Sequence, residues 1–339
     1  MNIKETATLA NFNCTFKYSN TTFPMLEYFE KIIWPAFNDK NLIRIYKNNR
    51  KKELITRYHI SDIEIIEMTD GNLALIGKHI KRTILDISED YSADKGFFGQ
   101  PELKPSAPYS TFILLLKNHR LIYFPNKTGA PNIVSFASTV RSIVNQFIDR
   151  KRVELLNSLS KDDYPTKEAL KFIHSEYPAA EINIVPIESE NLVNEAFSQI
   201  ASIKNVKFKF YKPNNEAIDT DNLFELSYSL IDSTNSKSLE QTLNSPQNIS
   251  VIEDAVNKSK GKADYKINAI NSKKEPFQIT PNKVSPKHNI IFIDSESVAN
   301  NSLNVYNQLK DRNELKEVSK ENSSTFKKFM TRLKSLKKK

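Results

Sequence analysis

The feature that most restricts the fold is a series of short segments, rich in β-branched and aromatic residues, between residues 42 and 87. Such segments are typical of strands. Connections this short join antiparallel neighbours, because parallel strands need a long crossover. Asp70-Gly71 is a strong signal for a hairpin turn. The region therefore predicts an antiparallel meander or small barrel. The segments are LIRIY, ELITRYHI, IEIIEM, NLALIGKHI and KRTILDI, and the breaks are KNNRKK, SD and TDGN.

Further strands are predicted on either side of this series. Phe12, Cys14 and Phe16 fall on one side of an alternating pattern, which predicts a strand with one buried face. Residues 112–116, FILLL, are apolar throughout and predict a central strand. Asn118-His119 follows as the expected turn of a hairpin.

Two segments of the first half have helical spacing. Apolar residues in 23–38 recur three or four positions apart, and Pro35 is expected to end that helix because proline lacks a backbone donor. Residues 130–159 predict one long helix, with Pro131 near its first turn. Its broad apolar face consists of Ile133, Phe136, Val140, Ile143, Val144, Phe147 and Ile148.

The stretch from 88 to 110 has a different composition, with three prolines and two glycines. Proline and glycine punctuate regular structure, so we expect a loop here. Long loops in compact domains are often functional, which makes this one a candidate site.

In the second half, helical and strand patterns alternate. Residues 181–187, 188–203 and 205–214 predict a strand-helix-strand unit, and 263–279 predicts a hairpin. The chain is thus expected to be an α+β protein: an N-terminal antiparallel β meander or small barrel, then an α/β domain with a strand-helix-strand unit. The predicted parts are a β-rich domain over 1–160 that ends in the long helix, an α/β domain over 161–318, and a basic amphipathic tail over 319–339.

Most of the net charge lies in this tail. Residues 320–339 hold eight Lys/Arg and one acid, a net +7, against +9 for the whole chain. A basic end on a nearly neutral body indicates an anionic partner. As a helix, the tail has an apolar stripe of Phe326, Phe329, Met330, Leu333 and Leu336. It is flanked by Lys327, Lys328, Arg332, Lys334, Lys337 and Lys338.

Three interpretations of the tail stay open. The stripe can dock on the body and present the cations to nucleic acid, the tail can lie on an anionic bilayer or a partner protein, or it can be a solvated end that aids solubility. Because the predicted core elements are complete without it, we expect the chain to fold when residues 320–339 are deleted.

The sequence contains a basic turn, KNNRKK at 47–52, and two more basic groups that are candidate nucleic-acid contacts. Arg150, Lys151 and Arg152 lie near the end of the long predicted helix. A second group follows one predicted strand, in which alternation places two lysines on one face and Phe208 and Phe210 on the other. The alternative is a solvated sheet face with lysines that protect an edge. The second group is Lys204, Lys207, Lys209 and Lys212.

Residues suited to catalysis are few. The stretch 71–79 has the wrong spacing for a phosphate-binding loop, and His79 stands where such a loop needs Ser or Thr. The five histidines are scattered and Cys14 is the single cysteine, so no metal site or cofactor is predicted. Asp94, Glu102 and Lys104 keep a metal-dependent nuclease open as an alternative.

The N-terminus lacks the features of a signal peptide, and no apolar run is long enough to span a membrane, so the chain is expected to be cytoplasmic. The order of elements in 108–148, 180–214 and 263–279 resembles the RexA-like phage exclusion proteins, over about a third of the chain. This resemblance implies a non-enzymatic homodimer that binds duplex DNA with little sequence preference and acts with a membrane-protein partner in abortive infection. A DNA or RNA preference does not follow from the residues themselves.

Overall fold

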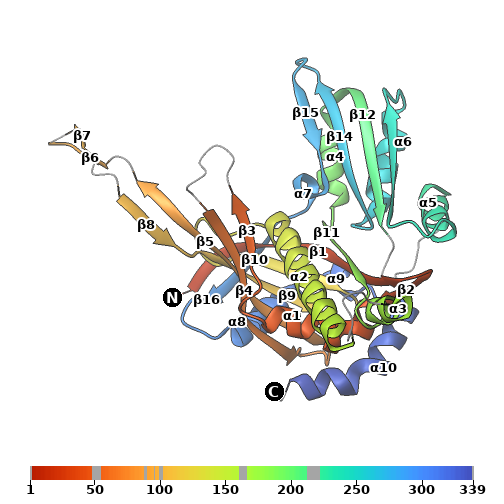
Figure 1. Cartoon of the computed structure of the whole chain (residues 1–339). Coiled ribbons are helices and arrows are strands. Elements are labelled where there is room, and N and C mark those ends of the chain that lie inside the picture. Colours follow the sequence, from red (N-terminus) through yellow and green to blue (C-terminus); the bar gives the residue numbers. More distant parts are fainter. Residues whose placement is uncertain are drawn as a thin grey trace.

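The computed structural model describes residues 2–47, 55–87, 90–94, 96–98, 102–159, 166–211 and 222–337. In this part the chain forms a large curled antiparallel sheet and a smaller four-stranded sheet, and helices cover both (Figure 1). The predicted α+β class, with its N-terminal antiparallel sheet followed by helix–strand units, is confirmed.

The large sheet is built around its first strand, β1 (Asn2–Tyr18), which pairs with β2, β10, β11 and β16. Its strand order is β11-β1-β10-β9-β5-β4-β3, and β8 pairs with β5. Because β11 and β16 follow the long helix, both halves of the chain contribute to this sheet. The other strands are β2 (Thr21–Pro24), β3 (Arg44–Lys47), β4 (Ile55–Glu67), β5 (Leu73–Ile87), β8 (Glu102–Ser106), β9 (Tyr109–Leu115), β10 (Arg120–Pro125), β11 (Ala179–Pro186) and β16 (His288–Ile293).

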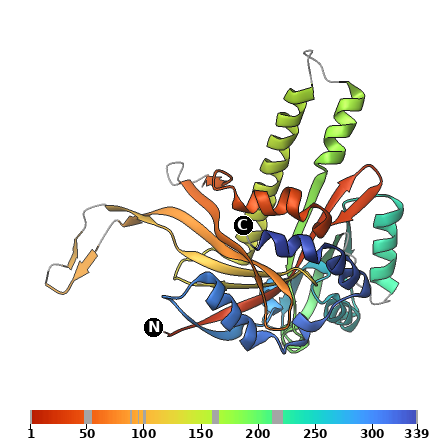
Figure 2. The same cartoon turned by 90° about the horizontal axis from the view of Figure 1, so that it is seen from below.

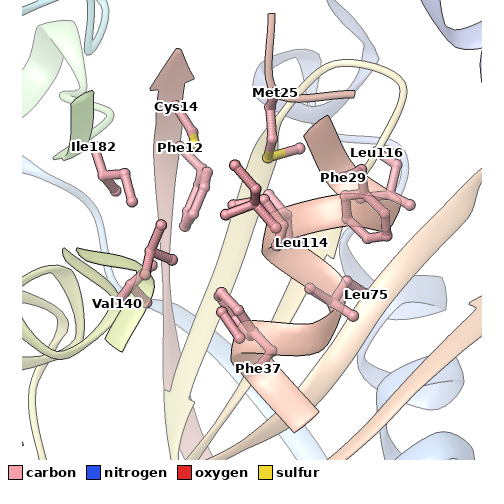
Figure 3. Packing of buried hydrophobic residues seen from close by; sticks show 14 of the residues in the cluster. Phe12, Cys14, Met25, Phe29, Phe37, Leu75, Leu114, Leu116, Val140 and Ile182 are labelled. Carbon is pink, nitrogen blue, oxygen red and sulfur yellow. The ribbon is translucent and has the colours of Figure 1, made fainter. Parts of the chain in front are cut away.

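Helices cover both faces of the large sheet. On one face, α2 packs over a core that includes Phe12 and Cys14 (Figure 3). Phe16 belongs to the same core, which confirms the predicted buried side of β1. All seven apolar residues predicted for the long helix are buried there. The helices of this face are η1 (Met25–Tyr28), η2 (Phe29–Ile33), α1 (Trp34–Asn38), α2 (Ile133–Leu159) and α10 (Lys320–Leu336), and those of the opposite face are α8 (Val298–Leu309) and α9 (Asn313–Lys316).

The small sheet has the order β13-β12-β14-β15 and its own hydrophobic core. The predicted strand-helix-strand order occurs as β11-α4-β12, with β11 in the large sheet and β12 in the small one. The elements around this sheet are α4 (Glu190–Ser198), β12 (Ile200–Tyr211), α5 (Asn222–Ser233), β13 (Ser238–Asn244), α6 (Ile249–Ser259), β14 (Ala263–Asn271), β15 (Pro276–Ile279) and α7 (Pro281–Val284).

Both predicted hairpin turns of the first half are confirmed. Asp70-Gly71 joins β4 to β5, and Gly71 has the positive φ of 77° that such turns require. Asn118-His119 joins β9 to β10. The predicted break at Ser61-Asp62 is instead a bulge within β4, where the register shifts and Asp62 has a φ of 54°.

Two expectations about local structure are wrong. Pro35 does not end the helical segment, because it occupies the first turn of α1, where a missing N–H costs nothing. The stretch 88–110 is not a structureless loop. It contains β6 (Asp90–Ser92), β7 (Gly96–Phe98) and β8, and strand β9 begins at Tyr109. Pro105 is tolerated because β8 is an edge strand that pairs with β5.

The domain boundary predicted near residue 160 falls in 160–165, outside the described residues. Beyond it, α3 (Lys167–Glu176) leads into β11. Strand β13 was not predicted, because its sequence SLEQTLN has a weak apolar alternation.

The tail forms α10, and its apolar stripe belongs to the core. Phe326, Phe329, Leu333 and Leu336 are at most 7% exposed and join the hydrophobic cluster under α2. The premise that the core elements are complete without these residues is therefore wrong: the docked interpretation of the stripe holds, and α10 is an integral helix of the fold.

Gly77 of β5 lies opposite Phe112 in the sheet and is expected to tolerate no side chain. A Cβ at this position would lie 2.4 Å from Ile63 Cδ1 and 2.9 Å from Phe112 Cζ. Gly77→Ala should therefore lower the free energy of unfolding by about 1–3 kcal/mol in urea titrations. Gly71→Asn is the control, since nothing lies near Gly71 and asparagine tolerates positive φ. Equal stability of the two variants would contradict this packing.

Candidate nucleic-acid interface

Helix α10 presents predicted contact residues on its solvent side. Lys327, Lys328 and Arg332 are exposed, and no described carboxylate lies within ion-pair distance of them. Lys328 Nζ lies 5.1 Å from the Phe329 ring centroid and Arg332 Cζ lies 6.0 Å from it, so a buried residue holds both side chains near the surface. These three residues form a basic surface on α10.

The end of α10 is less positive than its sequence indicates. Lys334 and Lys337 both approach Glu67 of β4, with Nζ–O distances of 3.5 and 3.6 Å. The two lysines share one carboxylate, so this group has a net charge of only +1. Lys338 lies outside the described residues.

The basic group near the end of α2 is largely neutralised. Arg150 Nη2 lies 2.5 Å from Asp39 Oδ2, and the hydrogen bond from Arg150 is the main cause that lowers the pKa of Asp39. Lys151 Nζ lies 2.6 Å from Glu154. Arg152 Nε donates to the Tyr177 carbonyl at 2.8 Å. These contacts attach α2 to its neighbours and leave little net charge on this surface.

The predicted lysines of β12 lie on the open face of the small sheet. Lys207 and Lys209 share this face while Phe208 and Phe210 are buried on the other, as the alternation predicts. Glu240 of β13 lies 2.5 Å from Lys207 Nζ and 3.0 Å from Lys209 Nζ, and the two lysines lower its pKa. Lys204 is exposed, and Lys212 lies outside the described residues.

A further concentration of positive charge was not among the predicted contacts. We call it the basic arm: residues 44–47 of β3, 55–61 of β4, 78–85 of β5 and 104–106 of β8, which lie where these strands extend from the body (Figure 1 and Figure 2). This segment contains no acidic residue; the next ones along β5 and β8, Asp86 and Glu102, have side chains outside the described part. Its seven basic residues are Arg44, Lys47, Arg57, Lys78, Lys81, Arg82 and Lys104.

The strand register of the arm places like charges side by side. Arg57 of β4 pairs directly with Arg82 of β5, so both guanidinium groups lie on one face. Their field reaches His59: burial lowers the pKa of His59, and Arg82 and Arg57 lower it further. Like charges at directly opposed positions destabilise a sheet. The repulsion between Arg57 and Arg82 therefore lowers the stability of the folded protein, and an anionic partner would relieve it.

Most of the arm's cations form no ion pair with another residue of the described part. Lys78 is paired with Asp62 at 2.6 Å. Five of the others have no ion-pair partner among the described residues, namely Arg44, Lys47, Arg57, Lys81 and Arg82. The one sequence signal for this surface is the basic stretch KNNRKK between β3 and β4, most of which lies outside the described residues. Arg57 and Arg82 are 25 positions apart, and only the register brings them together.

The residues of the nuclease alternative do not form a described metal site. Asp94 is exposed in the turn between β6 and β7, and Lys104 is exposed on β8. The side chain of Glu102 lies outside the described part. Within the described ranges, no group of three or more His, Cys, Asp or Glu side chains is placed to hold a metal ion.

His79 has a structural environment between β5 and α2. Its Nδ1 lies 2.9 Å from Tyr123 Oη, and its Nε2 lies 3.1 Å from Thr139 Oγ1. Burial lowers the pKa of His79 to about 3, with a further contribution from Arg44. The imidazole is therefore neutral at physiological pH and joins the sheet to the helix through hydrogen bonds.

Comparisons with known proteins show no matching family model, no similar curated protein and no similar solved structure. None of the helices in the described ranges is both long and apolar enough to cross a membrane.

Proposed function

We propose that this protein binds nucleic acid through phosphate contacts, with little preference for sequence. The basic arm carries the proposal, because it has seven basic residues, no acidic one, and an opposed Arg57–Arg82 pair. Lysine and arginine side chains that neutralise phosphates release bound counterions, which stabilises the complex without reading bases. The exposed cations of α10, Lys327, Lys328 and Arg332, are a second contact surface in this proposal.

The biological setting of the proposal comes from the resemblance to RexA-like phage exclusion proteins. On that basis the protein acts in the cytoplasm as a homodimer of an anti-phage, abortive-infection system, senses duplex DNA, and works with a membrane-protein partner. The resemblance in element order supports this setting, while the cations of the basic arm support the binding itself.

The experiment is a fluorescence-anisotropy titration of the full chain with two duplexes of unrelated sequence, over a series of salt concentrations. Similar affinities that fall steeply with salt are expected. Absence of binding at about 50 mM salt would refute the proposal, since phosphate contacts are strongest at low ionic strength. Cleavage of the duplex in the presence of magnesium or manganese would favour the nuclease alternative.

The variant Arg57→Gln/Arg82→Gln should weaken duplex binding and make the log–log salt slope shallower by about 1.8, because two phosphate contacts are lost. The same variant should be as stable as the natural protein or more so by about 0.2–1 kcal/mol, because the like-charge pair is removed. Lys167→Gln/Lys171→Gln, two exposed lysines of α3, is the control with the same change in net charge. An equal change in slope for both variants would show a general charge effect rather than contacts by the arm.

A further inference from the structure

One face of the basic arm combines an exposed aromatic ring with cations. The Arg44 guanidinium carbon lies 5.0 Å from the ring centroid of Tyr58 and 5.9 Å from that of Tyr46. Tyr46 is 51% exposed. Arg44 Nη1 is buried without a hydrogen-bond partner among the described residues. Because Nη1 is covered by protein, a ligand would contact Arg44 through its other guanidinium N–H groups.

The strand register defines which groups share this face. Arg44 of β3 pairs with Tyr58 of β4, and Tyr58 pairs with Lys81 of β5. Directly paired residues point to the same side of a sheet, so these three side chains form a row of two cations with a tyrosine between them. Tyr46 pairs with Thr56 in the next row on the same face. A ring therefore lies beside two positive side chains that have no carboxylate partner within the described ranges.

This combination fits one class of nucleic acid better than another. In a duplex the base faces are stacked inside the helix, and a surface side chain meets only phosphate, sugar and groove edges. In a single strand the base faces are accessible, and aromatic side chains beside cations bind them by stacking while the cations contact the backbone. A surface that needed only phosphate contacts would gain little from an exposed tyrosine ring.

We propose that this face of the arm is a binding site for single-stranded nucleic acid. Tyr46 stacks on an unpaired base, and Arg44 and Lys81 contact the adjoining phosphates. The opposite face, with Arg57 and Arg82, contacts phosphates of either form. The inference rests on the proposed function and adds to it the form of nucleic acid that the arm selects. An unpaired strand is also the form that displays bases in replication intermediates and in transcripts.

The test compares two ligands: an oligothymidylate of about 12 nucleotides and a blunt duplex of about 20 base pairs. Tyr46→Ala should weaken binding of the oligothymidylate about 5- to 100-fold, since stacking is worth about 1–3 kcal/mol per base. Binding of the duplex should change less than about twofold. Tyr46→Phe keeps the ring and should restore single-strand affinity. Phe172→Ala removes a ring that is 49% exposed on α3 and serves as the matched control.

The outcomes separate this inference from the proposed function. Natural protein that binds neither ligand refutes the proposed function. The stacking site is refuted if the natural protein binds both ligands and Tyr46→Ala either leaves both affinities unchanged or weakens both equally. Phosphate binding by the arm would then remain. An anionic bilayer is the other surface that this face could contact. Flotation with phosphatidylserine vesicles that Tyr46→Ala abolishes, without single-strand binding, would assign the face to a bilayer and overturn the inference.

Discussion

Deletion of residues 320–339 is expected to unfold the protein or leave it with a small part of its stability. The helix contributes Phe326, Phe329, Leu333 and Leu336 to the core beneath α2. Full burial of such side chains stabilises by about 1.5–3 kcal/mol each, so the helix contributes roughly 6–12 kcal/mol before the entropy of ordering it is subtracted. Domains are stable by only about 5–15 kcal/mol in total. The deleted chain should therefore lack a cooperative unfolding transition in urea.

A single substitution gives a finer measurement of the same packing. Leu333 is 2% exposed, and Leu333→Ala should lower the free energy of unfolding by about 2–5 kcal/mol. Trp34, the single tryptophan, packs against the same cluster, so its fluorescence reports the unfolding of this core in urea. Lys328→Ala on the exposed side of α10 is the matched control and should change stability by less than about 0.5 kcal/mol. If both variants unfold at the same urea concentration as the natural protein, α10 is not part of the core.

Local patterns in the sequence were sufficient to predict most individual elements. The seven apolar residues of the long helix recur at helical spacing, and all seven are buried in α2. An uninterrupted apolar run in β9 predicted a central strand correctly, and apolar alternation in β1 predicted the strand and the buried side of Phe12. The opposite side of β1 is buried as well, because Ala7 and Leu9 belong to the core on the other face of the sheet. Such patterns arise because each element must direct one set of side chains into a core, whatever that core is.

Patterns of this kind do not identify the partner of an apolar face. The stripe of α10 is compatible with a core, a bilayer or a second protein, because all three bury the same side chains. Contacts with helices η1 and η2, about 300 positions earlier in the chain, decide between them. The tail was predicted to be dispensable for folding because its net charge of +7 can be read from the sequence, whereas the burial of its four apolar residues cannot.

The basic arm was missed for a related reason. Its seven cations are distributed over four strands, β3, β4, β5 and β8, and thus over residues 44–104 of the sequence. Antiparallel register brings Arg57 to Arg82 and Tyr58 to Lys81, and register is a property of the pair of strands rather than of either sequence. By contrast, the conspicuous cluster of Arg150, Lys151 and Arg152 is engaged with nearby carboxylates and a carbonyl.

A buried carboxyl group is expected to make the protein less stable as the pH rises from 6.5 to 8. Glu188 follows β11 and is 7% exposed. It bonds with Ser259 Oγ, and it accepts from the backbone N–H of Gly261 at 2.9 Å. It thereby ties the end of β11, in the large sheet, to the loop between α6 and β14 of the small sheet. Burial raises the pKa of Glu188 from its ordinary 4.5 to about 8, although the backbone N–H groups and Lys260 oppose the change.

The direction of the effect follows from proton linkage. Between pH 4.5 and about 8 the folded protein keeps a proton on Glu188 that the unfolded chain releases, so stability falls as pH rises. Burial lowers the pKa of His79 to about 3 and of His119 to about 4, so these two groups add stability as the pH rises, but only up to their ordinary value of 6.5. Above pH 6.5 the Glu188 contribution is left unopposed by them. A slope of about 1.36 kcal/mol per pH unit then gives a loss of roughly 2 kcal/mol by pH 8.

Glu188→Gln isolates this contribution. The glutamine side chain is neutral at every pH. Its carbonyl keeps the hydrogen bond accepted from the Gly261 N–H, and its amide faces Ser259 Oγ, which donates to Glu188 in the natural protein and accepts from the glutamine amide in the variant. Urea unfolding at several pH values should therefore show a decline of about 2 kcal/mol between pH 6.5 and 8 in the natural protein and none in the variant. Glu195→Gln, at an exposed position of α4, should keep the natural decline. If the stability of Glu188→Gln declines with pH as steeply as that of the natural protein, the Glu188 carboxylate is ionised in the folded state. Its contacts with Ser259 and Gly261 would then stabilise a charge at the junction of the two sheets.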